Sequence, residues 1–178
     1  MNEARLARQR QDSKRFVIYT LVAAVVAAGA AWCSATLKFE VWVMFAGFIA
    51  WFSRPASSWD GASAMVCLWL GLGMGGGSFV ATGALVPAMG MFALPFVVFV
   101  VALIIVGLRT TRFFNNMLAW FLGMVTFSAA HMKPSDEALL HLGSASLIGG
   151  LAGWLCHTLT RRWASAPGPA SLEHWSRR

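Results

Sequence analysis

Apolar residues fill six stretches of the chain, and short polar or turn-forming segments separate them. The stretches cover residues 16–36, 41–53, 61–86, 91–108, 115–130 and 138–160, and none of them contains Asp, Glu, Lys or Arg. A helix needs roughly 20 apolar residues to cross a bilayer core of about 30 Å. The pattern therefore predicts an all-α polytopic membrane protein with six transmembrane segments.

The second and fifth segments are too short to cross a bilayer comfortably. A helix over residues 41–53 would be about 20 Å long at the α-helical rise per residue. The apolar part of the fifth segment begins only after Asn116, and His131 follows it closely. We expect each helix to tilt, to thin the bilayer locally or to end inside the membrane.

These short segments occupy corresponding places in a weak internal repeat. At offsets of 73 to 76 residues, Met44 aligns with Met117, Asp60 with Asp136, and the pair Gly75 and Gly76 with Gly149 and Gly150. Each unit would contain three segments, so the second copy would enter the membrane from the opposite face. We expect a 3+3 inverted repeat, an architecture in which paired short helices mark a solute site near the midplane. A plain six-helix bundle with two tilted spans is the alternative.

Positively charged residues lie almost entirely on one side of this arrangement. With the N-terminus inside, only Lys38 and Lys133 of the 14 Lys and Arg residues lie outside. Cationic loops resist translocation, so both termini are expected in the cytoplasm. The chain divides into a basic cytoplasmic segment (1–15), a membrane domain (16–162) and a flexible cytoplasmic tail (163–178). The first apolar stretch is long enough to be a retained helix rather than a cleaved signal.

The composition agrees with a membrane location. Hydrophobic residues make up 58% of the chain and charged residues 12%, which is too apolar for a water-soluble surface. The net charge of +7 comes from helix ends and tails rather than from a nucleic-acid-binding patch. We expect the lipid bilayer, with anionic inner-leaflet lipid, as the partner, and no nucleic acid. Cys33, Cys67 and Cys156 lack metal-binding spacing and are interpreted as packing residues.

Glycines at intervals of four predict close helix packing. The candidate helix-packing residues are Gly71, Gly73, Gly75 and Gly77 in the third segment and Gly149 and Gly153 in the sixth. Such spacing leaves a flat stripe on which another backbone can approach. We expect the third and sixth segments to cross at the centre; local unwinding of the glycine run is the alternative.

The polar groups within the segments are neutral. Buried charges mark proton relays and catalytic pairs, and no nucleophile–base pair or metal-ligand set can be assembled, so we expect no enzyme activity, cofactor or metal. A solute path would use uncharged groups, and the candidates are Trp51, Ser53, Trp120, Thr126 and Ser128. The alternative is that these hydroxyls bond to their own helix backbone and that the indole rings face lipid.

Two histidines flank the predicted outer loop between the last two segments. His131 and His141 are the candidate external gate, because histidine changes charge near neutral pH. Simple interfacial histidines are the alternative interpretation.

Three sequence features resemble a known family. They are the short second segment that ends at Arg54 and Pro55, the glycine-rich third segment, and the turn from Thr126 to His131. The chain resembles the domain of unknown function 1097 family, over about residues 16–162. The resemblance implies a small bacterial inner (cytoplasmic) membrane protein, and it brings no substrate or site residue.

Two functions follow from these patterns. The first is a channel or facilitator for a small neutral or weakly charged solute, suggested by the paired short segments and the absence of buried charge. The second is a non-transporting membrane subunit or assembly protein that packs against partner helices through the glycine stripes. Self-association into a homo-oligomer is also expected, because six helices of this length make a small bundle with little room for its own pore.

Overall fold

The computed structural model describes residues 3–54, 57–111 and 113–164, and every regular element in these ranges is helical. This confirms the all-α prediction. The elements are α1 (Glu3–Thr36), α2 (Val41–Phe52), α3 (Ser58–Met89), a 3-10 turn η1 (Gly90–Phe92), α4 (Ala93–Leu108), α5 (Met117–Ala130) and α6 (Asp136–Ala164). The predicted flexible tail covers residues 163–178. Only its first two residues, 163 and 164, belong to the described part of the chain.

The apolar helices are those of a multi-pass membrane protein. Phe16–Thr36, Ser58–Leu108 and Asp136–Arg161 are long and apolar enough to cross a bilayer, and Val41–Phe52 and Met117–Ala130 are shorter apolar helices. The second of the long stretches folds back on itself as α3 and α4. Helix α1 begins at Glu3, so part of the basic N-terminal segment continues directly into the first apolar helix.

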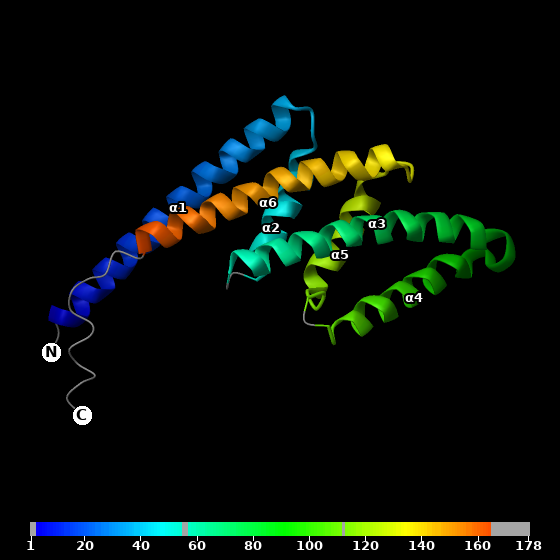
Figure 1. Cartoon of the computed structure of the whole chain (residues 1–178), viewed down its shortest axis with the longest axis horizontal. Helices are drawn as coiled ribbons and strands as arrows, with labels where there is room; N and C mark the ends of the chain where they lie inside the picture. The colour runs from blue at the N-terminus through cyan, green and yellow to red at the C-terminus, as the bar shows by residue number, and fades with distance from the viewer. Residues whose placement is uncertain (1–2, 55–56, 112, 165–178) are drawn as a thin grey trace.

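The helix ends gather on two opposite sides of the molecule (Figure 1). One side, which we call the terminal side, holds the starts of α1, α3 and α5 and the ends of α2, α4 and α6. The α1–α2, α3–α4 and α5–α6 connections lie on the other, which we call the distal side. Helices α1, α3, α4 and α6 run between these sides, and the short helices α2 and α5 pass behind them.

Each short helix packs against a long helix from the other half of the chain. Helix α2 lies against α6, and α5 lies against α3, and these are the most extensive helix contacts in the described structure. A methyl group added at Gly47 of α2 would overlap the carbonyl oxygen of Ser146, and one at Gly149 of α6 would overlap that of Met44. The backbones of α2 and α6 therefore meet without side chains between them, as glycine interfaces allow.

Helices α5 and α3 meet in the same way. A methyl group at Gly123 of α5 would overlap the carbonyl oxygen of Leu68, and one at Gly71 of α3 would overlap that of Trp120. The core of the molecule forms around these two crossings, and it includes Trp51 and Phe127.

Side-chain hydrogen bonds cap the helices that follow the turns. The Ser57 hydroxyl accepts the Asp60 N–H at 3.1 Å at the start of α3, and the Ser135 hydroxyl accepts the Ala138 N–H at 3.1 Å at the start of α6. These caps satisfy amide groups that the first helical turn leaves unpaired.

Candidate functional site

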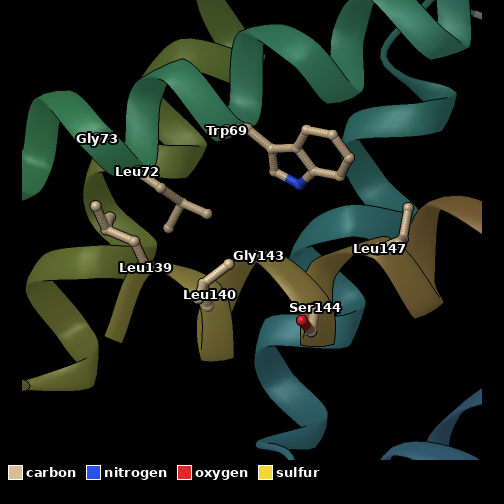
Figure 2. A pocket seen from close by; sticks show the side chains of 8 residues that line it. All are labelled: Trp69, Leu72, Gly73, Leu139, Leu140, Gly143, Ser144 and Leu147. Carbon is tan, nitrogen blue, oxygen red and sulfur yellow. The ribbon is translucent and has the colours of Figure 1, made fainter. Parts of the chain in front are cut away.

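A groove runs between α3 and α6 on the distal side of their contact (Figure 2). It has a volume of about 360 Å³ and is lined by Trp69, Leu72, Gly73, Leu139, Leu140, Gly143, Ser144 and Leu147. A second hollow of about 230 Å³ shares Gly73 and Leu139 with it and extends to Pro134, Ser135 and Asp136 in the α5–α6 turn. We call the two together the central groove.

The wall of the central groove combines leucine side chains with a few polar groups. The Trp69 indole N–H donates to the Ser146 hydroxyl at 3.1 Å, and that hydroxyl donates to the Gly143 carbonyl at 2.8 Å. The ring of Trp69 is thereby held between α3 and α6 (Figure 2). The nearby Ser144 is exposed, and its hydroxyl makes no hydrogen bond within the described part of the chain. A solute in the deep part of the groove would meet an aromatic ring and one free hydroxyl, and the outer part adds Ser135 and the Asp136 carboxylate.

The terminal half of the α3–α6 contact is closed by two large side chains. The Met65 sulfur lies 2.7 Å from the position that a Cβ atom at residue 150 would take, so it occupies the space that a side chain at Gly150 would need. The Trp51 ring packs against Gly61 and Gly153 in the same way. Met65 is 5% exposed and Trp51 is 8% exposed, so both fill the interior. Met65 and Trp51 therefore close the terminal end of the central groove, whereas Trp69 and Leu140 in its wall are 40% and 70% exposed, so the groove is open along the surface of the molecule.

A larger cavity of about 650 Å³ lies between α3, α4 and α5 on the distal side. We call it the lateral cavity. Its wall is mainly apolar, and its polar side chains are Ser78 and Thr82 of α3, Ser128 of α5 and His131. Phe127 lines both the lateral cavity and the outer part of the central groove, and it is the one residue that the two linings share.

The five candidate path residues do not line one common cavity. Trp51, Trp120 and Thr126 are buried, whereas Ser128 lies in the lateral cavity. The Trp120 indole N–H donates to the Phe114 carbonyl at 3.1 Å. Gly61 and Gly153 leave room for the Trp51 ring, whereas at Trp120 the backbone carbonyl, and not the ring, lies against a glycine, Gly71.

Ser53 takes part in a link between the two short helices. Its hydroxyl donates to the Ala50 carbonyl at 2.7 Å and accepts from the Asn116 side-chain amide at 2.6 Å. Asn116 is also the N-cap of α5, because its side-chain oxygen accepts the Ala119 N–H at 3.2 Å. Asn116 was not among the predicted site residues, although its position at the start of a short apolar helix is a typical cap signal.

The candidate packing glycines divide into two groups. Gly71 and Gly75 contact α5, and Gly149 and Gly153 contact α2, whereas Gly73 and Gly77 have no atom within 4 Å of the position that a Cβ atom would take. The prediction that these glycine stripes join the third segment to the sixth is therefore wrong about the contacting helix. The stripe of α3 packs against α5, and the stripe of α6 packs against α2. The short helices carry their own glycines and lie closer to α3 and α6 than these long helices lie to each other.

The two candidate gate histidines lie apart in different interactions. His141 Nε2 lies 2.8 Å from Glu40 Oε2, and its ring lies 4.9 Å from that of Phe39. His131 ends α5 in a left-handed conformation at φ 52°, with Nδ1 2.7 Å from the Ala129 carbonyl. His141 thus ties α6 to the α1–α2 turn, and His131 belongs to the rim of the lateral cavity.

Within the described ranges, no three His, Cys, Asp or Glu side chains come together as a metal site would require. No curated protein and no solved structure matches the chain. A family model does match, and it confirms the resemblance noted in the sequence. Because the match covers residues 20–161, the chain belongs to the family described as protein of unknown function (DUF1097).

Proposed function

We propose that this protein is a six-span inner-membrane channel or facilitator for a small neutral or weakly charged solute, built as a 3+3 inverted repeat and without catalytic activity. The observation that carries the proposal is the central groove. It lies where the two three-helix units meet, and it reaches from the distal surface to the middle of the long helices. Solute sites of inverted-repeat transporters lie at this interface, near the midplane.

The glycine contacts support the inverted repeat. The crossing of α2 with α6 and the crossing of α5 with α3 use equivalent residues. Residue numbers in α2 plus 76 give those in α5, and residue numbers in α3 plus 78 give those in α6. Gly47 then corresponds to Gly123, Met44 to Trp120, Leu68 to Ser146, and Gly71 to Gly149. The caps Ser57 and Ser135 follow the same offset of 78. The weaker sequence matches at 73 and 74 residues are thus displaced by about one helical turn.

The distribution of charge supports six crossings with cytoplasmic termini. Arg54, Arg109 and Arg161 follow helix ends or lie in a last turn on the terminal side, whereas Lys38 and Lys133 lie in distal turns. Cationic loops stay in the cytoplasm, where anionic lipid headgroups are their natural partner. Helices α2 and α5 contain 12 and 14 residues, so they would cross a bilayer only where it is thinned or where they are covered by protein.

The chemistry of the groove supports an uncharged or weakly charged solute. Its deep part is lined by four leucines, two glycines, the Trp69 ring and the Ser144 hydroxyl, without a charged side chain. A fully charged solute would lose its hydration there without a compensating ion. Met65 and Trp51 would have to move for release on the terminal side, because they fill that half of the interface.

The test is solute flux in proteoliposomes, with a substitution that fills the groove. Gly73→Leu adds a side chain where nothing lies within 4 Å of the Cβ position, so it should occupy the groove without displacing the backbone. Gly107→Leu on α4 is the matched control, because Gly107 is also unobstructed but lies away from the groove. For any small uncharged solute that the protein carries, we expect at least a tenfold loss of flux with G73L and little change with G107L. Flux no greater than in empty liposomes for a broad panel would overturn the proposal.

A non-transporting membrane subunit is the second candidate. Helix α4 packs mainly against α3 and exposes a large apolar face. The exposed residues include Phe96, Phe99, Leu103 and Ile104. A partner helix or a second copy of the chain could cover this face in place of lipid. Isolation of the protein in a fixed ratio with an unrelated membrane chain would favour this function over transport.

A further inference from the structure

The lateral cavity is open from the side of the molecule. Helix α4 rests on α3 and has little contact with α5, so the wall between α4 and α5 is incomplete on the distal side. The volume of about 650 Å³ lies within the range of roughly 300–1,000 Å³ that is typical of small-molecule sites. A ligand could therefore enter from the hydrocarbon without passing through the central groove.

The hydroxyls of α3 present only acceptors to this cavity. The Ser78 hydroxyl donates to the Met74 carbonyl at 2.6 Å, and the Thr82 hydroxyl donates to the Ser78 carbonyl at 2.8 Å. Each hydroxyl has a single proton, which is used in these bonds, so its oxygen lone pairs remain available. Both side chains line the cavity and can accept a hydrogen bond from a ligand.

His131 extends this pattern at the rim of the cavity. Its Nδ1 lies 2.7 Å from the Ala129 carbonyl, which can only accept, so a hydrogen bond between them requires the tautomer with the proton on Nδ1. In the neutral ring Nε2 is then an acceptor. The Ser128 hydroxyl, which has no hydrogen bond within the described ranges, contributes the one free donor of the wall.

The remaining lining residues are glycines and apolar side chains, and none is Asp, Glu, Lys or Arg. Burial of an ionised ligand would be unfavourable without a compensating charge. We infer that the lateral cavity binds an uncharged, mainly apolar small molecule that carries a hydrogen-bond donor. The site is distinct from the proposed solute path, because the two linings share only Phe127, and the inference stands whether or not the central groove conducts.

A matched pair of probes tests the donor requirement. The probe 1-naphthol has an apolar body and one O–H donor, and 1-methoxynaphthalene has nearly the same body with the donor blocked. Binding is measured by equilibrium dialysis against the protein in nanodiscs, with empty nanodiscs as the reference for partition into lipid. We expect saturable binding of 1-naphthol, about threefold to tenfold tighter than that of 1-methoxynaphthalene, which is the usual net effect of one hydrogen bond.

Two substitutions test the location. Gly83 lines the cavity and has no atom within 4 Å of its Cβ position, so Gly83→Leu should fill the cavity and abolish binding of 1-naphthol. Val98→Phe fills the same space from α4 if G83L does not fold. Gly73→Leu in the central groove is the control and should leave this binding unchanged while it reduces solute flux. Absence of saturable 1-naphthol binding, equal affinity for the two probes, or binding that survives both filling substitutions would overturn the inference.

Discussion

At the scale of single residues, two glycines of similar sequence setting have opposite environments. Gly149 faces the Met44 carbonyl so closely that an alanine side chain would overlap it, whereas Gly77 faces open space. Gly149→Ala should force α2 and α6 apart and lower stability by about 1–3 kcal/mol, the usual effect of overpacking. Gly77→Ala should raise stability by up to about 1 kcal/mol, because alanine favours the helix. Thermal unfolding of both variants in the same detergent, followed by circular dichroism, measures the difference.

Equal unfolding temperatures for the two variants would contradict the glycine crossing.

The outcome also bears on what the sequence could predict at this scale. The spacing of Gly71, Gly75, Gly149 and Gly153 correctly indicated close helix contact. It could not identify the partner, since a flat stripe shows only that some backbone can approach. Gly47 and Gly123 complete the crossings, and they lie in the short segments as isolated glycines without a stripe pattern.

Polar pairs were harder to predict than the glycine contacts. The Asn116–Ser53 bond and the Trp69–Ser146 bond join positions 63 and 77 residues apart in the chain. Hydropathy locates each of these residues in or near a helix, but it carries no information on which helices are neighbours. Ser146 in particular reads as an ordinary hydroxyl on an apolar helix, and only the fold places the Trp69 indole beside it.

At the scale of helices, α6 has two adjacent faces that can be distinguished chemically. Ser144 is exposed to the central groove, whereas Ser146 is 0% exposed beneath Trp69. On a background without Cys33, Cys67 and Cys156, Ser144→Cys should react with a water-soluble maleimide in liposomes. Ser146→Cys should stay unreactive, because a thiol must reach water to ionise and react. The ratio of the labelling rates of S144C and S146C measures how accessible the groove is to water.

Similar, slow labelling at both positions would mean that lipid fills the groove, and it would remove the support for a solute path there.

The presence of this groove could not be predicted from the sequence, although the lengths of the helices around it could. The short segments at 41–53 and 115–130 correspond to α2 and α5, because loss of apolar pattern and cap residues mark helix ends well. The shape of the space between α3 and α6 depends on how the short helices hold them apart.

At the scale of the whole molecule, hydropathy and charge are the strongest sequence signals, because every segment contributes to them. They predicted the helical class and the order of the apolar segments. The arrangement of the two halves depends on contacts between helices that are distant in sequence, and it came only with the fold. The exchange of short helices, α2 onto α6 and α5 onto α3, makes each half depend on the other for its core. Neither half should therefore fold as an independent unit.

The proposed inverted repeat makes its own prediction about sidedness. Lys38 lies two residues after the first helix of the first unit, and Thr110 lies two residues after the first helix of the second unit, so they occupy corresponding turns of the proposed repeat. A three-segment unit reverses its direction in the second copy, which puts equivalent turns on opposite faces of the membrane. With the basic terminal side in the cytoplasm, Lys38→Cys on the thiol-free background should be labelled in intact cells by an impermeant maleimide. Thr110→Cys should be labelled only after the cells are permeabilised. Labelling of both positions from the same side would show parallel halves, and the solute path proposed between α3 and α6 would lose its structural basis.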